Sequence, residues 1–316
     1  MRVLVTGGAG FLGSHLVDAL VARGDDVRVL DNLRRGSLQH IESHVDAGKL
    51  TFIRGDVRDE SEVWRAARDA EVVYHLAAQS NVMGALEDVD YSFGTNVIGT
   101  FNTLKAAAAA GSRRLVFASS REVYGDSESL PVPESAALLA KNPYGASKVA
   151  GEAYCRVWQQ VKGLDCLALR FANLYGPRDR DRVIPLWLSQ ARRGEDLVLF
   201  GGQQVLDFFW VGHAVRALIA AADSPNEGPI NVGSGQGVAL PNLAERVVKL
   251  TGSRSAVRRC PAREVEVVRF VADVGKMRRL LGVDPPPDPL DSLPSLASAE
   301  AARDRSARPE GGAVQV

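Results

Sequence analysis

The chain opens with a regular alternation of two kinds of segment that continues to about residue 170. Short runs rich in β-branched residues are followed by longer amphipathic or alanine-rich stretches, and the runs read RVLVT, DVRVLD, LTFIRGD, EVVYHLAA, RLVFASS and DCLALRFAN. Apolar runs of this length between helix-like stretches indicate β-α-β units around a buried parallel sheet. The pattern therefore predicts an α/β fold, with a Rossmann-like doubly wound parallel sheet over residues 1–173.

The rhythm loosens beyond Asn173, where loops such as YGPRDRDR, LFGGQQ and NVGSGQG separate shorter elements. We expect a smaller C-terminal substrate-binding lobe over residues 174–283, with a soft boundary across which segments can interleave. Residues 284–316 are rich in proline, serine, alanine and charge but poor in large apolar residues. Such a composition offers little burial to offset the entropy of ordering, so we expect most of this tail to be mobile.

The charge and cysteine content narrows the classes of function. Lys plus Arg and Asp plus Glu both number 38, so the net charge of zero gives no basis for binding nucleic acid or an anionic membrane. The three cysteines lack C-x-x-C spacing, and His40 and His44 have no third ligand nearby, so neither a disulfide framework nor a metal site is expected. The first run starts at residue 2 and no apolar run reaches membrane-spanning length. We therefore expect a cytoplasmic protein without a signal peptide.

A glycine loop follows the first run in VLVTGGAGFLGSHLVDAL, where Gly8, Gly10 and Gly13 have the spacing G-x-G-x-x-G. Glycines at these positions allow a tight turn and close approach of a pyrophosphate to the first amides of a helix. The second run ends at Asp31, whose carboxylate can accept hydrogen bonds from adenosine ribose hydroxyls. This acid favours NAD over NADP, although Arg34 and Arg35 follow closely and could hold a 2′-phosphate.

Further motifs give the chain a clear resemblance to the extended short-chain dehydrogenase/reductase family, specifically its NAD-dependent nucleotide-sugar epimerases and dehydratases, such as UDP-glucose 4-epimerases. The resemblance runs from Met1 to about Gly282. It rests on the motifs TGGAGFLG, GDV, HLAAQ, NVIGT, SSREVYG, NPYGASK, RFANLYGPR and REVEV before FVAD.

The resemblance implies a set of site residues. For the cofactor NAD these are Gly7, Gly10, Phe11, Leu12, Gly13, Asp31, Asn32, Asp56, Val57, Leu76, Ala77, Ala78, Asn96, Ser119, Tyr144 and Lys148, with Asp56 and Val57 at the adenine. For a nucleotide-sugar substrate they are Gln79, Ser120, Arg121, Asn173, Arg178 and Arg263, with Asn173 and Arg263 at the diphosphate. The resemblance also implies a homodimer through residues 93–110 and 143–161, although the alanine-rich face of TLKAAAAAG could instead pack on the sheet.

Tyr144 and Lys148 are four residues apart, so on a helix they share one face. We expect the lysine ammonium to lower the pKa of the phenol, which makes Tyr144 a base for a sugar hydroxyl, while Ser120 hydrogen-bonds the same oxygen. An isolated pair of this spacing is more often a solvated helix face. The glycine loop and the SSREVYG segment favour the catalytic interpretation.

The chain also departs from the family pattern. Leu206 precedes Asp207 where an arginine commonly contacts the substrate diphosphate, and the tail lacks the usual final apolar helix. Arg178 and Arg180 are candidates to replace the missing contact, but both could equally belong to an ordinary solvated loop.

Arg121 and Glu122 raise a question about the reaction. In resembling dehydratases and decarboxylases a glutamate directly before V-Y-G is common, and in the dehydratases it takes the C5 proton, which makes Glu122 a tentative catalytic residue. Many of those dehydratases place an acid before it, a role that Arg121 cannot fill. Alternatively the two residues form a local ion pair.

Four functions follow. The leading hypothesis is a nucleotide-sugar 4-epimerase acting through a transient 4-keto intermediate. The alternatives are a dehydratase or decarboxylase that uses Glu122 at C5, a 4-ketoreductase, and a non-catalytic NAD-binding sensor.

Overall fold

The computed structural model describes residues 1–127 and 129–306. Its centre is a seven-stranded sheet in which all neighbouring strands are parallel. The strand order β10-β6-β5-β4-β1-β2-β3 is that of a doubly wound sheet, so the predicted fold class is confirmed. The strands are β1 (Arg2–Thr6), β2 (Asp26–Asp31), β3 (Leu50–Arg54), β4 (Val72–His75), β5 (Arg114–Ser120), β6 (Asp165–Phe171) and β10 (Ile230–Val232).

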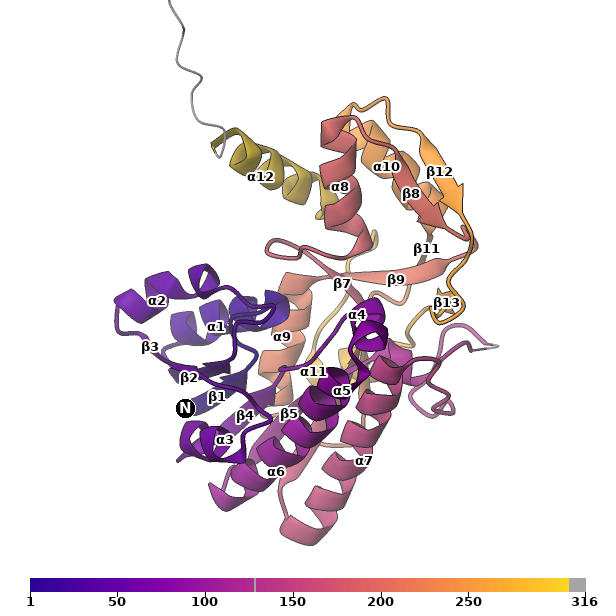
Figure 1. Ribbon diagram of the computed structural model, residues 1–316. Coiled ribbons are helices and arrows are strands. Elements are labelled where there is room, and N and C mark those ends of the chain that lie inside the picture. Colours follow the sequence, from indigo (N-terminus) through magenta and orange to yellow (C-terminus); the bar gives the residue numbers. More distant parts are fainter. Residues whose placement is uncertain (128, 307–316) are drawn as a thin grey trace, which may run out of the picture.

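Helices cover both faces of this sheet because its strands are apolar on both sides (Figure 1). In β1, Val3 and Val5 face α1, α9 and α11, whereas Leu4 faces α3, α6 and α7. The helices of this domain are α1 (Phe11–Arg23), α2 (Glu42–Asp46), α3 (Glu60–Ala67), α4 (Val82–Glu87), α5 (Val89–Phe93), α6 (Gly99–Ala109), α7 (Pro143–Lys162), α9 (Val211–Ala221) and α11 (Gly275–Leu281). Short turns are η1 (Leu38–His40), the π-helical η2 (Gly94–Ile98) and η3 (Arg121–Val123).

Three elements that lie beyond residue 173 belong to the sheet domain. They are β10, which pairs with β6, and the helices α9 and α11. Residue 173 therefore does not separate two continuous domains. Segments after residue 173 alternate between the smaller lobe and the sheet domain. The sequence signal for β10 was weak because the strand is only three residues long.

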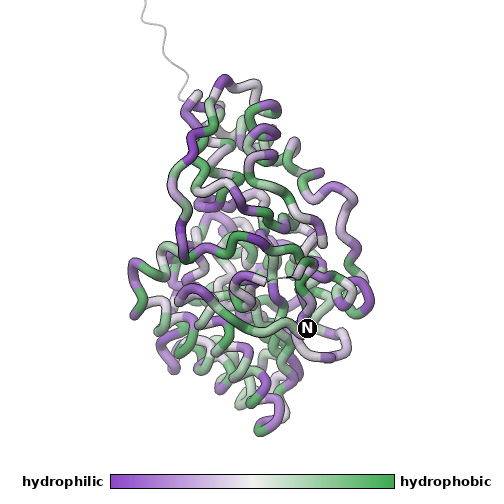
Figure 2. Tube along the Cα trace, turned by 90° about the vertical axis from the view of Figure 1, so that its right-hand side faces the viewer, coloured by the Kyte–Doolittle hydropathy of each residue, from purple (hydrophilic) through white to green (hydrophobic). Residues whose placement is uncertain are grey.

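The smaller lobe lies beyond the carboxyl ends of the sheet strands. It contains a four-stranded sheet, a two-stranded sheet and three helices, and Figure 2 shows it as a narrower body on the broader domain. Trp187, Phe208 and Leu243 are buried in its separate core. Its elements are β7 (Asn173–Tyr175), β8 (Leu197–Phe200), β9 (Val205–Trp210), β11 (Gly237–Ala239), β12 (Val257–Cys260), β13 (Arg269–Phe270), α8 (Val183–Arg193), α10 (Leu240–Thr251) and α12 (Leu293–Ser306).

The expectation of a mobile tail was wrong for the residues that the structure describes after 283. Leu290, Leu293 and Leu296 are at most 2% exposed and join the core of the smaller lobe. Residues 293–306 form α12, which contacts α10 and stands beside α8 in Figure 1. Composition misled here because three well-placed leucines suffice to dock a short helix. The expectation for residues 307–316 lies outside the described residues.

The helices of both the sheet domain and the smaller lobe were compared with what a membrane-spanning helix requires. In the described ranges 1–127 and 129–306, no helix combines the length and apolar character that a bilayer crossing requires.

Candidate active site

A cavity of about 650 Å³ lies between the carboxyl edge of the large sheet and the smaller lobe. Strands β1, β2, β4 and β5 end at it, as expected for a ligand site in a doubly wound fold. Nearly all residues implicated by the sequence line it. These are Gly7, Gly10, Phe11, Leu12, Gly13, Asp31, Asn32, Val57, Leu76, Ala77, Ala78, Gln79, Ser119, Ser120, Arg121, Glu122, Tyr144, Lys148, Asn173, Arg178, Arg180 and Arg263.

The glycine loop between β1 and α1 is closed by contacts that leave no space for side chains. Gly7 has a φ of +73°, and a Cβ on Gly13 would lie 2.1 Å from the carbonyl oxygen of Gly7. Gly10 is the N-cap of α1 and has no side chain to cap the first helical amides. These amides therefore face the cavity. Such an arrangement is suited to a pyrophosphate at a helix N-terminus.

Asp31 ends β2 beside this loop. Its carboxylate accepts hydrogen bonds from the amides of Ala9 at 3.0 Å and Leu33 at 2.8 Å. Burial raises the pKa of Asp31, and the two amide bonds oppose this effect without reversing it. A carboxylate has about four acceptor positions, so two remain for ribose hydroxyls.

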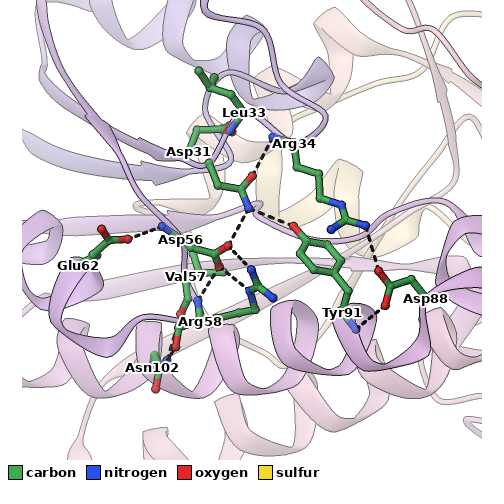
Figure 3. A network of polar contacts seen from close by, with 11 residues as sticks. Asp31, Leu33, Arg34, Asp56, Val57, Arg58, Glu62, Asp88, Tyr91 and Asn102 are labelled. Atoms are coloured by element: carbon green, nitrogen blue, oxygen red, sulfur yellow. Dashed lines mark hydrogen bonds and ion pairs between the residues drawn. The ribbon is translucent and has the colours of Figure 1, made fainter.

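A polar network beside Asp31, shown in Figure 3, surrounds the Asp56 carboxylate. The Asp56 carboxylate accepts two bonds on Oδ1 from Arg58 and two on Oδ2, from Arg58 and Asn32. All of its acceptor positions are therefore used. Asp56 is not among the residues that line the cavity, whereas Val57 is. Asp56 therefore holds this part of the cavity wall in place, and the contacts of Asp56 and Val57 with adenine stay predictions.

The same network accounts for Arg34, which the sequence analysis weighed as a ligand for a 2′-phosphate. Its guanidinium stacks on the Tyr91 ring at 3.6 Å and pairs with Asp88 at 3.1 Å (Figure 3). The neighbouring Arg35 pairs with Asp181 at 2.8 Å. Both arginines are thus committed to carboxylates of this chain, in agreement with NAD as the dinucleotide.

Asn96 is buried and does not line the cavity, so its expected contact with the cofactor stays a prediction. Its amide group bonds the Gln79 backbone amide at 2.8 Å and carbonyl at 3.2 Å, and it donates to the Ser147 hydroxyl at 3.0 Å. Asn96 therefore joins the loop after β4 to α7. It positions Gln79, which does line the cavity.

The predicted catalytic residues come together where β5 meets the start of α7. The helix begins at Pro143, and the Asn142 side chain caps it by accepting a bond from the Gly145 amide at 2.8 Å. This start places the Tyr144 phenol close enough to Ser120 for its hydroxyl to act on the pKa of the phenol, and both residues line the cavity. Lys148 follows one turn later, with its Nζ 5.7 Å from the Tyr144 ring centre and 4.8 Å from the Phe117 ring centre.

Burial dominates the acid-base properties of these groups. It raises the pKa of Tyr144, although Ser120, Arg182 and Arg121 act in the opposite direction. The expectation that the pKa of this phenol lies below its ordinary value was therefore wrong for the protein alone. Burial also lowers the pKa of Lys148 to about 8, and the nearby Glu152 only partly opposes this change.

A buried network behind the catalytic residues was missed by the sequence analysis. Glu152, one turn beyond Lys148 on α7, receives two bonds from Arg170 of β6, at 2.9 and 2.6 Å, and one from the Ser119 hydroxyl. Arg170 also donates to the Tyr124 hydroxyl at 2.8 Å. The network ties α7 to β5 and β6 directly behind Ser120. In the sequence, the network was indicated only by the four-residue spacing of Lys148 and Glu152, which puts Glu152 on the same helix face as Lys148.

Arg121 and Glu122 form an ion pair, but it is buried rather than solvated. Arg121 Nη2 lies 2.8 Å from Glu122 Oε1, and the two side chains are 12% and 6% exposed. Glu122 Oε2 accepts a bond from Asn142 at 2.8 Å. Both carboxylate oxygens of Glu122 are therefore engaged by groups of this chain.

The substrate side of the cavity contains the predicted Asn173 and Arg263. Asn173 donates to the Asp207 backbone carbonyl at 3.0 Å, and Arg263 stacks on Phe200 at 3.7 Å and pairs with Glu266 at 3.0 Å. Leu206 lines the cavity as an apolar residue in place of the usual arginine.

Asp207 points away from the cavity and organises the neighbouring backbone. Its carboxylate accepts four bonds, from the Ser234 amide and hydroxyl and from the amides of Gly235 and Ala272. Burial nevertheless raises the pKa of Asp207 to about 6.

The charged loop over residues 176–182 closes one side of the cavity and is held against the sheet domain. The His15 imidazole bonds the Pro177 carbonyl at 2.8 Å, and Arg178 pairs with Asp18 at 2.8 Å. With the Arg35–Asp181 pair, three contacts tie this loop to α1 and to the residues after β2. Arg182, which lies in the same loop and acts on Tyr144, was not singled out from the sequence.

Comparison with known proteins adds to this geometry. Residues 3–233 match the model of the NAD-dependent epimerase/dehydratase family. A putative UDP-glucose 4-epimerase of Methanocaldococcus jannaschii is 35% identical, over 88% of this chain and 92% of that protein. A UDP-N-acetyl-α-D-glucosaminuronate decarboxylase of Bacillus cytotoxicus is 33% identical, over 90% and 92%. The structure of a dTDP-glucose 4,6-dehydratase of Streptomyces venezuelae with NAD bound is 31% identical, with a TM-score of 0.92 over 97% of this chain and 98% of that one.

Proposed function

The chain belongs to the NAD-dependent epimerase/dehydratase family, and from that premise we propose that it is a nucleotide-sugar 4-epimerase acting through a 4-keto intermediate. The family makes it an NAD-dependent enzyme of nucleotide-sugar metabolism. One observation carries the finer assignment. Ser120 and Tyr144 meet inside the cavity, whereas Glu122, the group that C5 chemistry would need, is already engaged by Arg121 and Asn142.

The residues of the cavity fit NAD. The glycine loop leaves the backbone bare where a pyrophosphate would lie, and Asp31 keeps free acceptor positions for ribose hydroxyls. Val57, Leu76, Ala77 and Ala78 would line the adenosine and nicotinamide path. Oxidised NAD carries a positive charge and accepts a hydride from the sugar carbon.

Tyr144 would act as base and acid at the C4 oxygen. We assign it the removal of the hydroxyl proton as the ketone forms, while the Ser120 hydroxyl donates a hydrogen bond to the same oxygen. The Lys148 ammonium supplies positive charge beside the phenol. After the keto-sugar has turned in the cavity, C4 would take back the hydride on its opposite face while Tyr144 would return the proton to the C4 oxygen.

A dehydratase or decarboxylase is the second candidate, because Glu122 does line the cavity. To take the C5 proton in a dehydration, or to deliver a proton to C5 after loss of CO2, Glu122 would have to become neutral and leave the buried Arg121 without its charged partner. Loss of one member of a buried ion pair costs about 3 to 5 kcal/mol. This cost favours the epimerase.

Two experiments test the proposal. Incubation of the NAD-loaded protein with UDP-, dTDP-, GDP- and CDP-sugars should yield a C4 epimer, and Tyr144→Phe should remove most of this activity while NAD binding stays nearly unchanged. Tyr154→Phe, on an exposed part of the same helix, is the matched control and should retain activity. No product from any sugar, or full activity in Tyr144→Phe, would refute the proposal.

Reaction in heavy water separates the two candidates. Inversion at C4 without deuterium at C5 is expected for the epimerase. Deuterium at C5 that disappears in Glu122→Gln would instead establish the dehydratase or decarboxylase chemistry.

We also propose a homodimer built from α7 and the α5–η2 segment of each copy. Phe93, Ile98, Val157 and Val161 are 41 to 63% exposed on these neighbouring helices, which is costly for a monomer. The alanine-rich face of α6 is not part of this surface, because Ala106 and Ala107 pack on the sheet. Light scattering should give twice the chain mass of 33.9 kDa. A mass of one chain at micromolar concentration would contradict the dimer.

A further inference from the structure

Arg121 has a hydrogen-bond donor that its ion pair with Glu122 does not use. Nη2 pairs with Glu122, but Nη1 is buried and has no hydrogen-bond partner among residues 1–127 and 129–306. The side chain lines the cavity and is 12% exposed. Buried donors are nearly always paired, so this nitrogen is suited to an acceptor that arrives with a ligand.

The position of Arg121 identifies the part of the ligand that it would contact. It directly follows Ser120, and its charge acts on the Tyr144 phenol. In the proposed reaction these two residues hold the C4 oxygen, so Arg121 reaches substituents of the sugar ring near C4. The diphosphate is expected elsewhere, beside Asn173 and Arg263.

The local charge balance favours an anionic substituent. Glu122 offsets Arg121, and Asp179 pairs with Arg182 at 2.8 Å. Lys148, whose pKa is about 8, remains charged at neutral pH, and the nearby Glu152 is already paired with Arg170 at 2.6 Å. Guanidinium groups bond carboxylates more strongly than neutral oxygens, and the C6 carboxylate of a uronic acid is a charged group two bonds from C4.

We propose that Arg121 is a specificity residue that binds the C6 carboxylate of a nucleotide-linked uronic acid through Nη1. This inference rests on the proposed nucleotide-sugar function. The enzyme prefers such a substrate over the otherwise identical sugar with a neutral hydroxymethyl group. Arg121 then bridges two carboxylates, that of Glu122 and that of the substrate.

The test compares affinities for UDP-glucuronate and UDP-glucose by calorimetry on the NAD-loaded protein. The wild type should bind the uronate about 10- to 100-fold more tightly, the range expected for one hydrogen bond between charged groups. A double variant, Arg121→Met with Glu122→Gln, removes both members of the buried pair and avoids an isolated charge. It should lose the preference while its affinity for UDP-glucose changes less than about threefold, and circular dichroism verifies its fold.

A control variant, Arg180→Met, tests whether another arginine of the cavity supplies the selectivity. It should retain the preference. Loss of the preference in Arg180→Met with retention in the double variant would overturn the role of Arg121. Equal affinity of the wild type for both sugars would overturn the inference but leave the epimerase standing. Failure of UDP, dTDP, GDP and CDP alike to bind would overturn the proposed function as well. A parallel loss of NAD affinity in the double variant would show that Nη1 serves the cofactor instead.

Discussion

Replacement of Lys148 by methionine should make the folded protein more stable while it removes activity. Lys148 is 2% exposed, and burial lowers its pKa from 10.5 to about 8. A shift of about 2.5 units at about 1.4 kcal/mol per unit corresponds to a cost of about 3.5 kcal/mol for the buried ammonium. Methionine has a similar length and carries no charge, so Lys148→Met should recover most of this cost.

The pH dependence gives the prediction its sign. Below pH 8 both folded and unfolded chains carry the lysine proton, and the full cost is present. Between pH 8 and 10.5 the folded protein releases this proton while the unfolded chain keeps it, so the stability of the wild type rises with pH. The advantage of Lys148→Met should therefore be about 3 kcal/mol at pH 7 and shrink towards zero near pH 10.5.

Urea denaturation of the NAD-free protein from pH 7 to 10 measures this difference. Lys162→Met, at the exposed end of the same helix, is the matched control and should change stability by less than about 0.5 kcal/mol. A Lys148→Met variant that is less stable than the wild type at pH 7, or a gain that does not depend on pH, would refute the reasoning.

Two further substitutions test the packing around the site. Leu293→Ala should lower the free energy of unfolding by about 2 to 5 kcal/mol, because Leu293 is fully buried in the core of the smaller lobe. Leu250→Ala, at a 36% exposed site on α10, is the control. Equal effects of the two substitutions in urea denaturation would contradict the docking of α12. Glu152→Gln should lower it by about 3 to 5 kcal/mol, because Arg170 is 4% exposed and would lose its charged partner. Thermal unfolding measures this loss, and a change below about 1 kcal/mol would mean that Ser119 and Tyr124 suffice to hold Arg170.

The parts of the fold that follow from local chemistry could be predicted from the sequence. The β-branched runs predicted β1 to β6 because a strand between two layers of helices needs apolar side chains on both of its faces. The glycine loop and Asp31 were recognisable because few residues can replace a glycine whose Cβ would meet a carbonyl at 2.1 Å. Tyr144 and Lys148 were found because helical spacing alone puts them on one face.

The other features of the site could not be predicted, because they depend on which residues far apart in the sequence come into contact. Asp56 has the residue type that could bind adenine, but only the structure shows that Arg58 and Asn32 use all of its acceptor positions. Arg121 and Glu122 were expected either in catalysis or in a local ion pair, and their burial could not be read from the sequence. The docking of α12 was missed because composition averages over a segment, whereas burial depends on three leucines.

The loop over residues 176–182 would restrict exchange of the dinucleotide more than exchange of the sugar nucleotide. Its three contacts with α1 and with the residues after β2 hold it across the part of the cavity that the glycine loop shares. We expect exchange of the dinucleotide to require these contacts to open, and exchange of a sugar nucleotide on the side of the smaller lobe to leave them closed. We therefore expect one NAD molecule to serve many successive sugars. Such an enzyme would work at a rate that does not follow the ratio of oxidised to reduced NAD in its surroundings.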